Sequence, residues 1–184
     1  MISCQSMGIR KLAARGDRKV HSGSGNFKQI EMSSTHKPTG NIEILFGTSW
    51  IEGRMGDRIR AEGCGGAGVD LATVMDGVEI LVDGANISVA ALKDAIFLVL
   101  RDLLAGCEDL ASGRLERTSV HFYESPWEVS IRREGRAALV SFFRGGLNPR
   151  IEVKDRAVDF DCLVSSLVEA GSSLAGGLAS LNPQ

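Results

Sequence analysis

The segment from Gly63 to Gly68 has the Gly-x-Gly-x-x-Gly spacing of a loop that binds a dinucleotide. That loop holds pyrophosphate only where a buried strand precedes it and a helix follows it, because the helix N-terminus supplies the amide donors. Here the six preceding residues include four charged ones, and nine residues separate Gly68 from the strand at Val78. We therefore interpret the segment as a mobile glycine-rich loop, and we expect no nucleotide or other cofactor.

Three histidines occur, and only His121 falls on a predicted strand; His21 and His36 lie near the N-terminus. His121 has no His or Cys two or four residues away, so the sequence predicts no metal site. A Cys or Ser nucleophile with His121 and an acid such as Glu124 or Glu128 would suit acyl transfer. No Gly-x-Ser-x-Gly turn, which would position a serine nucleophile, is present. An enzyme centred on His121 is therefore the alternative hypothesis and not the favoured one.

The four cysteines are widely spaced, and none forms a Cys-x-x-Cys pair. No secretory signal precedes them, so we expect reduced thiols and a cytoplasmic protein. Cys107 and Cys162 fall at apolar positions of predicted helices, which predicts that both act as small core residues.

Charge divides the chain into two parts. Residues 1–38 hold seven Lys and Arg against two acidic residues, whereas residues 39–184 hold fourteen against twenty-one. We expect residues 1–40 to form a disordered basic tail and residues 41–184 to form a single domain. An acidic body argues against nucleic-acid binding, and no uncharged apolar stretch reaches the ~18 residues that a membrane span needs.

Periodicity predicts the elements of the domain. Alternation predicts strands at 41–46 and 78–82, which share a Glu-Ile-Leu core and are expected to pair. We expect a long loop over 47–68, with a short strand at 58–62. Ser88 is the predicted N-cap of a helix from Val89 to about Leu110. Its apolar stripe comprises Leu92, Ile96, Val99, Leu103, Cys107 and Leu110.

Three strands joined by short turns follow, over 118–124, 126–133 and 136–143. A short fourth strand is expected at Ile151 and Val153, and then an amphipathic helix from about Asp159. The apolar face of that helix comprises Phe160, Leu163, Val164, Leu167, Val168 and Leu174. The predicted fold is α+β, with an antiparallel sheet of about five to seven strands, one long buried helix and a C-terminal amphipathic helix.

The outward face of these strands is the predicted functional surface. Alternation places polar side chains there, at His121, Tyr123, Glu128, Ser130 and Arg132. Exposed Tyr and Arg commonly anchor a protein partner. The apolar side chains of Leu139 and Phe143 lie beside them, and two copies of the chain would be able to associate through these two residues.

Composition and spacing together favour a small, soluble, non-catalytic protein that binds another protein. A toxin-neutralising (immunity-type) protein and a subunit of a bacterial assembly are two such functions.

Overall fold

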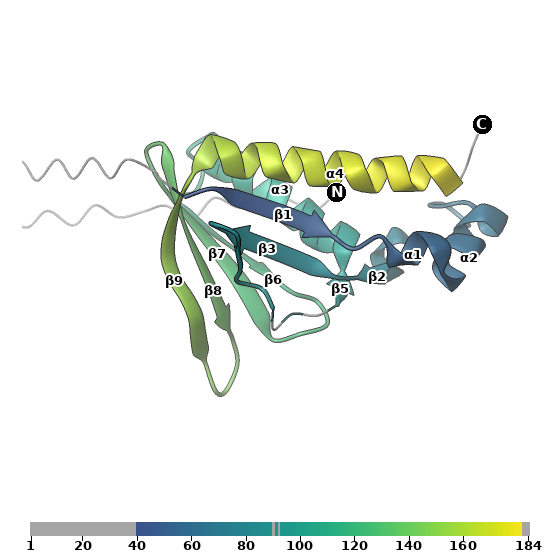
Figure 1. The fold of residues 1–184 in the computed structure, drawn as a ribbon, viewed down its shortest axis with the longest axis horizontal. Coiled ribbons are helices and arrows are strands. Elements are labelled where there is room, and N and C mark those ends of the chain that lie inside the picture. The colour runs from purple at the N-terminus through teal and green to yellow at the C-terminus, as the bar shows by residue number, and fades with distance from the viewer. Residues whose placement is uncertain (1–39, 90, 92, 182–184) are drawn as a thin grey trace, which may run out of the picture. The chain divides into compact units, whose positions relative to one another are not determined.

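The computed structural model describes residues 40–89, 91 and 93–181. The expected basic tail, except for Gly40, and Leu92 of the expected helix stripe therefore lie outside the described residues. The α+β class is confirmed: helices alternate with antiparallel strands, and these strands are divided among three sheets (Figure 1).

The first sheet contains β1 (Ile42–Phe46), β3 (Val78–Val82) and β4 (Ala85–Asn86), in that order. The predicted pairing of β1 with β3 is confirmed, with Ile44 opposite Ile80. Both strands alternate buried and more accessible residues, because one face covers the core. Asp83 and Gly84 form the β3–β4 turn with positive φ angles of 52° and 77°, as a tight hairpin requires.

The prediction of a loop over 47–68 is wrong for most of that segment, and the suggested strand at 58–62 is helical. The chain forms α1 (Ser49–Glu52) and α2 (Arg54–Glu62). Trp50 and Ile59 are buried, so few apolar side chains are enough to fix both helices. Gly177 of the C-terminal helix makes room for Trp50, since a Cβ at Gly177 would lie 3.2 Å from its ring. These long-range contacts override a locally polar sequence.

Ser88 does not cap a helix, which is a second correction. The 3₁₀ turn Leu71–Thr73 leads to β2 (Met75–Asp76), which pairs with β5 (Asp94–Ala95), and α3 (Ile96–Ala111) begins only after β5. The buried Ser88 hydroxyl instead accepts from Ile80 N at 2.9 Å and donates to Val78 O at 3.0 Å. It therefore satisfies strand β3 where β4 ends.

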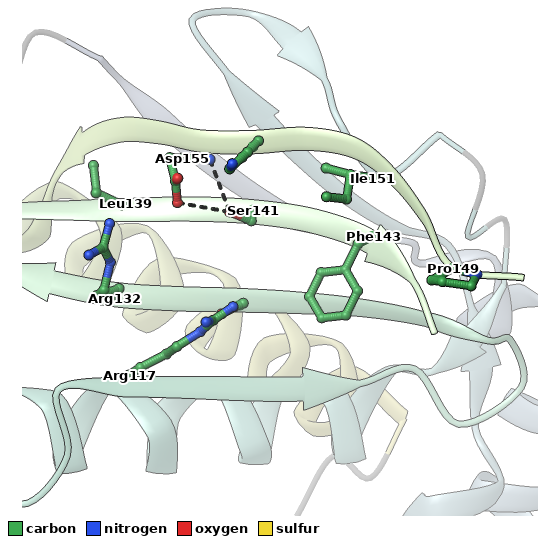
Figure 2. Close-up of a pocket in the computed structure, with 10 residues that line it drawn as sticks. Arg117, Arg132, Leu139, Ser141, Phe143, Pro149, Ile151 and Asp155 are labelled. Atoms are coloured by element: carbon green, nitrogen blue, oxygen red, sulfur yellow. Dashed lines mark hydrogen bonds between the residues drawn. The ribbon is translucent and has the colours of Figure 1, made fainter. Parts of the chain in front are cut away.

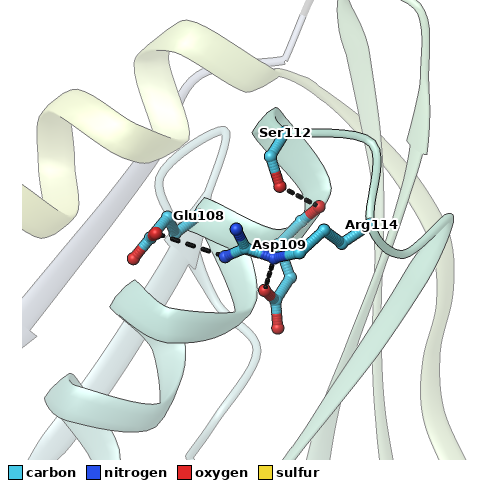
Figure 3. A network of polar contacts seen from close by, with 4 residues as sticks. All are labelled: Glu108, Asp109, Ser112 and Arg114. Carbon is cyan, nitrogen blue, oxygen red and sulfur yellow. Dashed lines mark hydrogen bonds and ion pairs between the residues drawn. The ribbon is translucent and has the colours of Figure 1, made fainter.

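Helix α3 is buried along the predicted stripe, with Ile96, Val99, Leu103, Cys107 and Leu110 in the core. Its last turn holds a polar network, shown in Figure 3. Arg114 Nε donates to Asp109 Oδ1 at 2.6 Å, and its Nη2 donates to Glu108 Oε1 at 3.2 Å. This network fixes the turn that leads from α3 into the next strand.

Two buried aspartates are paired in the short β2–β5 ladder, where Asp76 is opposite Asp94. Asp94 accepts hydrogen bonds from the backbone N–H groups of Ala95 (2.8 Å), Tyr123 (2.7 Å) and Glu124 (3.0 Å). Asp76 accepts from Trp50 N at 3.1 Å, at the start of α1. Each carboxylate thus connects segments that are far apart in the sequence.

The largest sheet is a meander of β6 (Arg117–His121), β7 (Trp127–Glu134), β8 (Ala137–Arg144) and β9 (Arg150–Asp159). The predicted inward side chains are confirmed as core, and they include Val120, Phe122, Val129 and Ile131. Tight turns in the sequence predict Tyr123 opposite Glu128 and Ser130 near Leu139. The observed pairing is displaced from this by two residues, since Glu128 lies opposite His121 and Ser130 lies opposite Ser141. A shift of two leaves every side chain on its predicted face.

Strand β9 is much longer than the short strand that was expected, and the β8–β9 hairpin extends away from the helices (Figure 1). Its pairing with β8 is irregular at two places, between Val140 and Phe142 and between Phe142 and Phe143. Asp155 lies at the first of these and has a positive φ of 49°. Such bulges bend a strand and increase its twist.

Helix α4 (Phe160–Leu181) lies along β1 (Figure 1). Two expectations for it are wrong: Cys162 is exposed and Val168 is 57% exposed. Among the described helices, α4 is long and apolar enough to cross a membrane by length and composition, with 28% of that stretch buried in the protein.

Truncation of Ile96 or Phe122 to Ala should lower the free energy of unfolding by about 2–5 kcal/mol, because both side chains are buried. Urea denaturation would measure this, with the exposed Leu147 truncated to Ala as control. Unchanged midpoints for Ile96 and Phe122 would contradict the core assignment.

Substitution Asp94→Ala should lower the free energy of unfolding by at least about 3 kcal/mol, because three backbone donors lose their acceptor. The exposed Glu79→Ala variant should stay within about 0.5 kcal/mol of the parent. Equal melting curves for both variants would show that Asp94 does not hold the β6–β7 connection.

Candidate functional site

The structure separates the five residues of the predicted binding surface. His121 and Glu128 lie opposite each other, with His121 Nδ1 3.2 Å from Glu128 Oε1. The imidazole is largely exposed at the open edge of the sheet, where β6 pairs with β7 alone. This pair is the nearest approach to the acid–base arrangement that the sequence suggested.

Tyr123 does not share a surface with Arg132, because β6 ends at His121 and Asp94 holds the backbone of Tyr123. Its hydroxyl donates to Asp102 Oδ2 at 2.6 Å and accepts from Arg101 Nη2 at 3.0 Å. The hydrogen bond to Asp102 raises the pKa of the phenol. Tyr123 is 46% exposed, as predicted, but it lies over α3.

Ser130 is buried, with 2% of its surface exposed, which corrects its assignment to an exposed face. It does point to the outward side of the sheet, where the side chain of Arg117 covers it. Arg117 Nε donates to Ser130 Oγ at 2.7 Å, and the Ser130 hydroxyl is 3.3 Å from Thr118 O. The serine thereby holds the guanidinium across the strands.

Arg132 and Ser130 belong to a pocket of about 450 Å³ on the outward face of the meander, here called the sheet groove (Figure 2). The core-forming residues of the same strands point to the opposite face. Figure 2 shows Arg117 and Arg132 toward one end of the groove and Phe143, Pro149 and Ile151 toward the other. The lining residues are Arg117, Ser130, Arg132, Leu139, Ser141, Phe143, Pro149, Ile151, Lys154 and Asp155.

The bulge in β9 forms one wall of the sheet groove. Asp155 N donates to Ser141 Oγ at 2.9 Å, and the Ser141 hydroxyl lies 3.3 Å from Asp155 Oδ1 (Figure 2). Strain at a non-glycine residue with positive φ is typical of functional positions. Here the two hydrogen bonds fix the carboxylate of Asp155 against β8.

The sheet groove combines charged and apolar side chains that suit the binding of a ligand. Its lining has three cationic side chains, one carboxylate and an apolar floor, but neither His nor Cys. In the part of the chain that the structure describes, no group of three His, Cys, Asp or Glu residues is arranged to hold a metal ion.

The glycine-rich segment is not built as a dinucleotide loop. It follows helix α2 directly, with Gly63 as the C-cap at a φ of 73°, and only the short 3₁₀ turn Leu71–Thr73 follows it. Val69 N donates to Gly63 O at 2.9 Å, which closes the loop on itself. The strand and helix that would position pyrophosphate are therefore replaced by other elements.

Sequence reasoning found Arg132 and the neighbouring Leu139 and Phe143, but it missed the other cations of the groove. Arg117 lies directly opposite Arg132. Alternation continued back by one strand residue would have placed it on the same face. Lys154 and Asp155 gave no such signal, because the bulges break the alternation of β9.

Comparison with known proteins gives no relative: no family model matches the chain, and no curated protein or solved structure is significantly similar to it.

The thiols should differ sharply in reactivity. Burial raises the pKa of Cys107 to about 11, so at pH 8 only about one molecule in a thousand carries the thiolate there. Iodoacetamide at that pH should alkylate the exposed Cys64 and Cys162 and spare Cys107, as peptide mass mapping would show. Modification of Cys107 in the folded protein at a rate equal to that of Cys162 would contradict its burial.

Proposed function

We propose that this chain is a small, soluble, non-catalytic module that binds another protein, and that the sheet groove is its binding surface. The observation that carries the proposal is the groove itself, which combines an apolar floor with cationic side chains on an exposed sheet face. Ile151 is 62% exposed there, beside the half-buried Leu139 and Phe143. Such mixed surfaces suit protein recognition, in which an apolar centre is surrounded by polar groups.

The polar groups of the groove are already engaged in ways that favour a fixed shape over turnover. The Ser130 hydroxyl bonds Arg117, and the Ser141 hydroxyl bonds Asp155. The groove lining contains no imidazole, and Ser130 is bonded by a guanidinium, which does not act as a base. Within the described part of the chain, the amine of Lys154, which also lines the groove, makes no hydrogen bond to either serine. The groove therefore supports binding better than it supports nucleophilic catalysis.

The alternative of an enzyme built around His121 receives less support. Among the described residues, the acidic partner of the His121 imidazole is Glu128, and the pair lies at the solvent-exposed edge of the meander. The nearby pocket along α3 and β6 includes Ser119, but in the part of the chain that the structure describes its hydroxyl makes no hydrogen bond to His121. No reaction class follows from this arrangement.

Two cellular functions fit a protein-binding module of this size in the cytoplasm. An immunity-type protein would cover a toxin with the sheet groove, and an assembly subunit would hold a neighbouring subunit with it. Both functions make the same structural demand, which is one protein surface seated on the outward face of β6–β9.

The proposal is tested by affinity capture from cells of the natural source, using Ile151→Asp and, as matched control, Val168→Asp. Both are exposed apolar residues, 62% and 57% exposed, but Val168 lies on α4. We expect Ile151→Asp to lose a protein that the parent and Val168→Asp both retain, with similar melting curves for all three.

Loss with Val168→Asp alone would place the binding surface on α4 and overturn the assignment of the groove. Retention by both variants would overturn it as well. If the captured protein is the chain itself, sedimentation of the parent would show a dimer that Ile151→Asp dissociates, and the partner would be a second copy.

A further inference from the structure

Charge in the folded part of the chain is concentrated by segment. Residues 117–156, which include most of the meander, hold eight Lys and Arg against five acidic residues. The remainder of residues 39–184 holds six against sixteen. The meander is therefore the cationic part of an otherwise acidic body, and an acidic partner would be attracted to it and repelled elsewhere.

Several of these cations already have a structural function. Arg133 lies 4.5 Å over the Phe160 ring and donates to the carbonyls at the end of α3. Arg150 pairs with Glu152 at 2.8 Å, and Arg136 lies 3.8 Å from Asp159. Among the described residues, the cations of the meander that have neither an acidic side chain within 4.0 Å nor the contacts of Arg133 are Arg117, Arg144, Lys154 and Arg156.

Two of those four, Arg117 and Lys154, line the sheet groove. Arg117 uses Nε on Ser130, so its two terminal nitrogens remain for a ligand. A guanidinium fixed in this way matches a carboxylate, which it binds through two parallel hydrogen bonds.

Arg117 lies directly opposite Arg132 on the neighbouring strand, and like charges in that position repel each other. Glu134 relieves part of this repulsion, because its Oε1 lies 3.1 Å from Arg132 Nη1. Asp155 at the far wall already accepts from Ser141. An incoming carboxylate between the two arginines would remove the remaining repulsion.

The apolar end of the groove sets a second requirement. Arg132 pairs with Leu139, and Phe143 is four residues further along β8, beside Ile151. Four strand residues span about 13 Å, which equals the reach of about four residues in an extended partner. A partner segment would thus place a carboxylate and an apolar side chain at that separation.

We infer that the sheet groove binds an extended, acidic segment of a partner protein, with a Glu or Asp side chain between Arg117 and Arg132 and an apolar side chain on Phe143 and Ile151. This inference rests on the proposed function, and it names the chemistry of the partner.

The probe is a set of blocked synthetic peptides of equal length, titrated into the isotopically labelled chain and followed by amide chemical shifts. One peptide carries Glu and Phe about four residues apart, matching the ~13 Å separation. A second has Gln for the Glu, and a third has Ala for the Phe. A short single-stranded oligonucleotide serves as an unrelated polyanion.

We expect the Glu–Phe peptide to shift amides of β6–β9 and to bind about tenfold more tightly than either substituted peptide, as one lost charge-assisted hydrogen bond implies. Arg117→Gln should abolish the difference between the Glu and Gln peptides. Arg156→Gln is the matched control, since this exposed arginine lies on the same sheet but lines a different pocket, and it should preserve the difference.

Equal binding of the Glu and Gln peptides, equal effects of Arg117→Gln and Arg156→Gln, or shifts outside the groove would each overturn the inference. If the oligonucleotide binds more tightly than the Glu–Phe peptide and shifts the same amides, the ligand of the groove is a nucleic acid and the inference of an acidic protein segment is wrong.

A captured partner that needs Ile151 but is retained by Arg117→Gln would refute the acidic segment and leave the proposed function standing. Capture that is independent of Ile151 would refute the proposed function itself.

Discussion

The buried carboxylate of Asp94 is the constraint on which the arrangement of the domain depends. It lies at the start of α3, and it accepts the backbone amides of Tyr123 and Glu124 from the β6–β7 connection. A buried carboxylate is stable only when donors replace the water that it has lost, and three amides do so here. Asp94 therefore positions the long helix relative to the meander, with Asp76 connecting α1 to the same ladder.

This connection has a direct effect on the sheet groove. The helices bind the inner face of the meander through apolar contacts, which include Phe142, Leu163 and Leu167 in one core. The inner face is thereby fully used, and the alternation of the strands leaves Arg117, Arg132 and Phe143 on the other side. The order of the groove thus comes from the core beneath it. The hydroxyls of Ser130 and Ser141 also accept hydrogen bonds from Arg117 Nε and Asp155 N, and these bonds fix the polar walls of the groove.

Elements with strong periodicity could be predicted from the sequence, and these include β1, β3, α3 and the inward residues of the meander. Their apolar residues repeat at strand or helix spacing over whole elements, so local pattern and tertiary burial agree. The failures fall where a distant residue decides. Helices α1 and α2 depend on the packing of Trp50 at Gly177. The Ser88 hydroxyl bonds the backbone of β3 and therefore does not cap a helix.

The difference between local pattern and distant contacts also explains which residues of the candidate site could be predicted from the sequence. Arg132 was predicted because it continues the alternation of the regular strand β7. Leu139 and Phe143 were predicted because they continue the alternation of β8. Tyr123 was misplaced because Asp94, twenty-nine residues earlier, withdraws its backbone from the strand. No pattern within 118–124 carries that information. Ser130 was assigned to the correct face, but its cover by Arg117 depends on pairing between strands.

The two irregularities in β9 have a consequence for how this chain can change in length. Each extra residue in a strand reverses which side of the sheet the following side chains occupy, so one bulge alone would put the tip and the base of β9 out of phase. Two bulges restore the phase, which is why Ile151 pairs with Phe143 and Ala157 pairs with Leu139 on one common side. Loss or gain of a single residue between the two bulges would move the side chains of the hairpin tip to the opposite face of the sheet. A change of two residues would leave them on the same face. A change in the length of β9 therefore keeps the lining of the sheet groove on one face only if it preserves this parity.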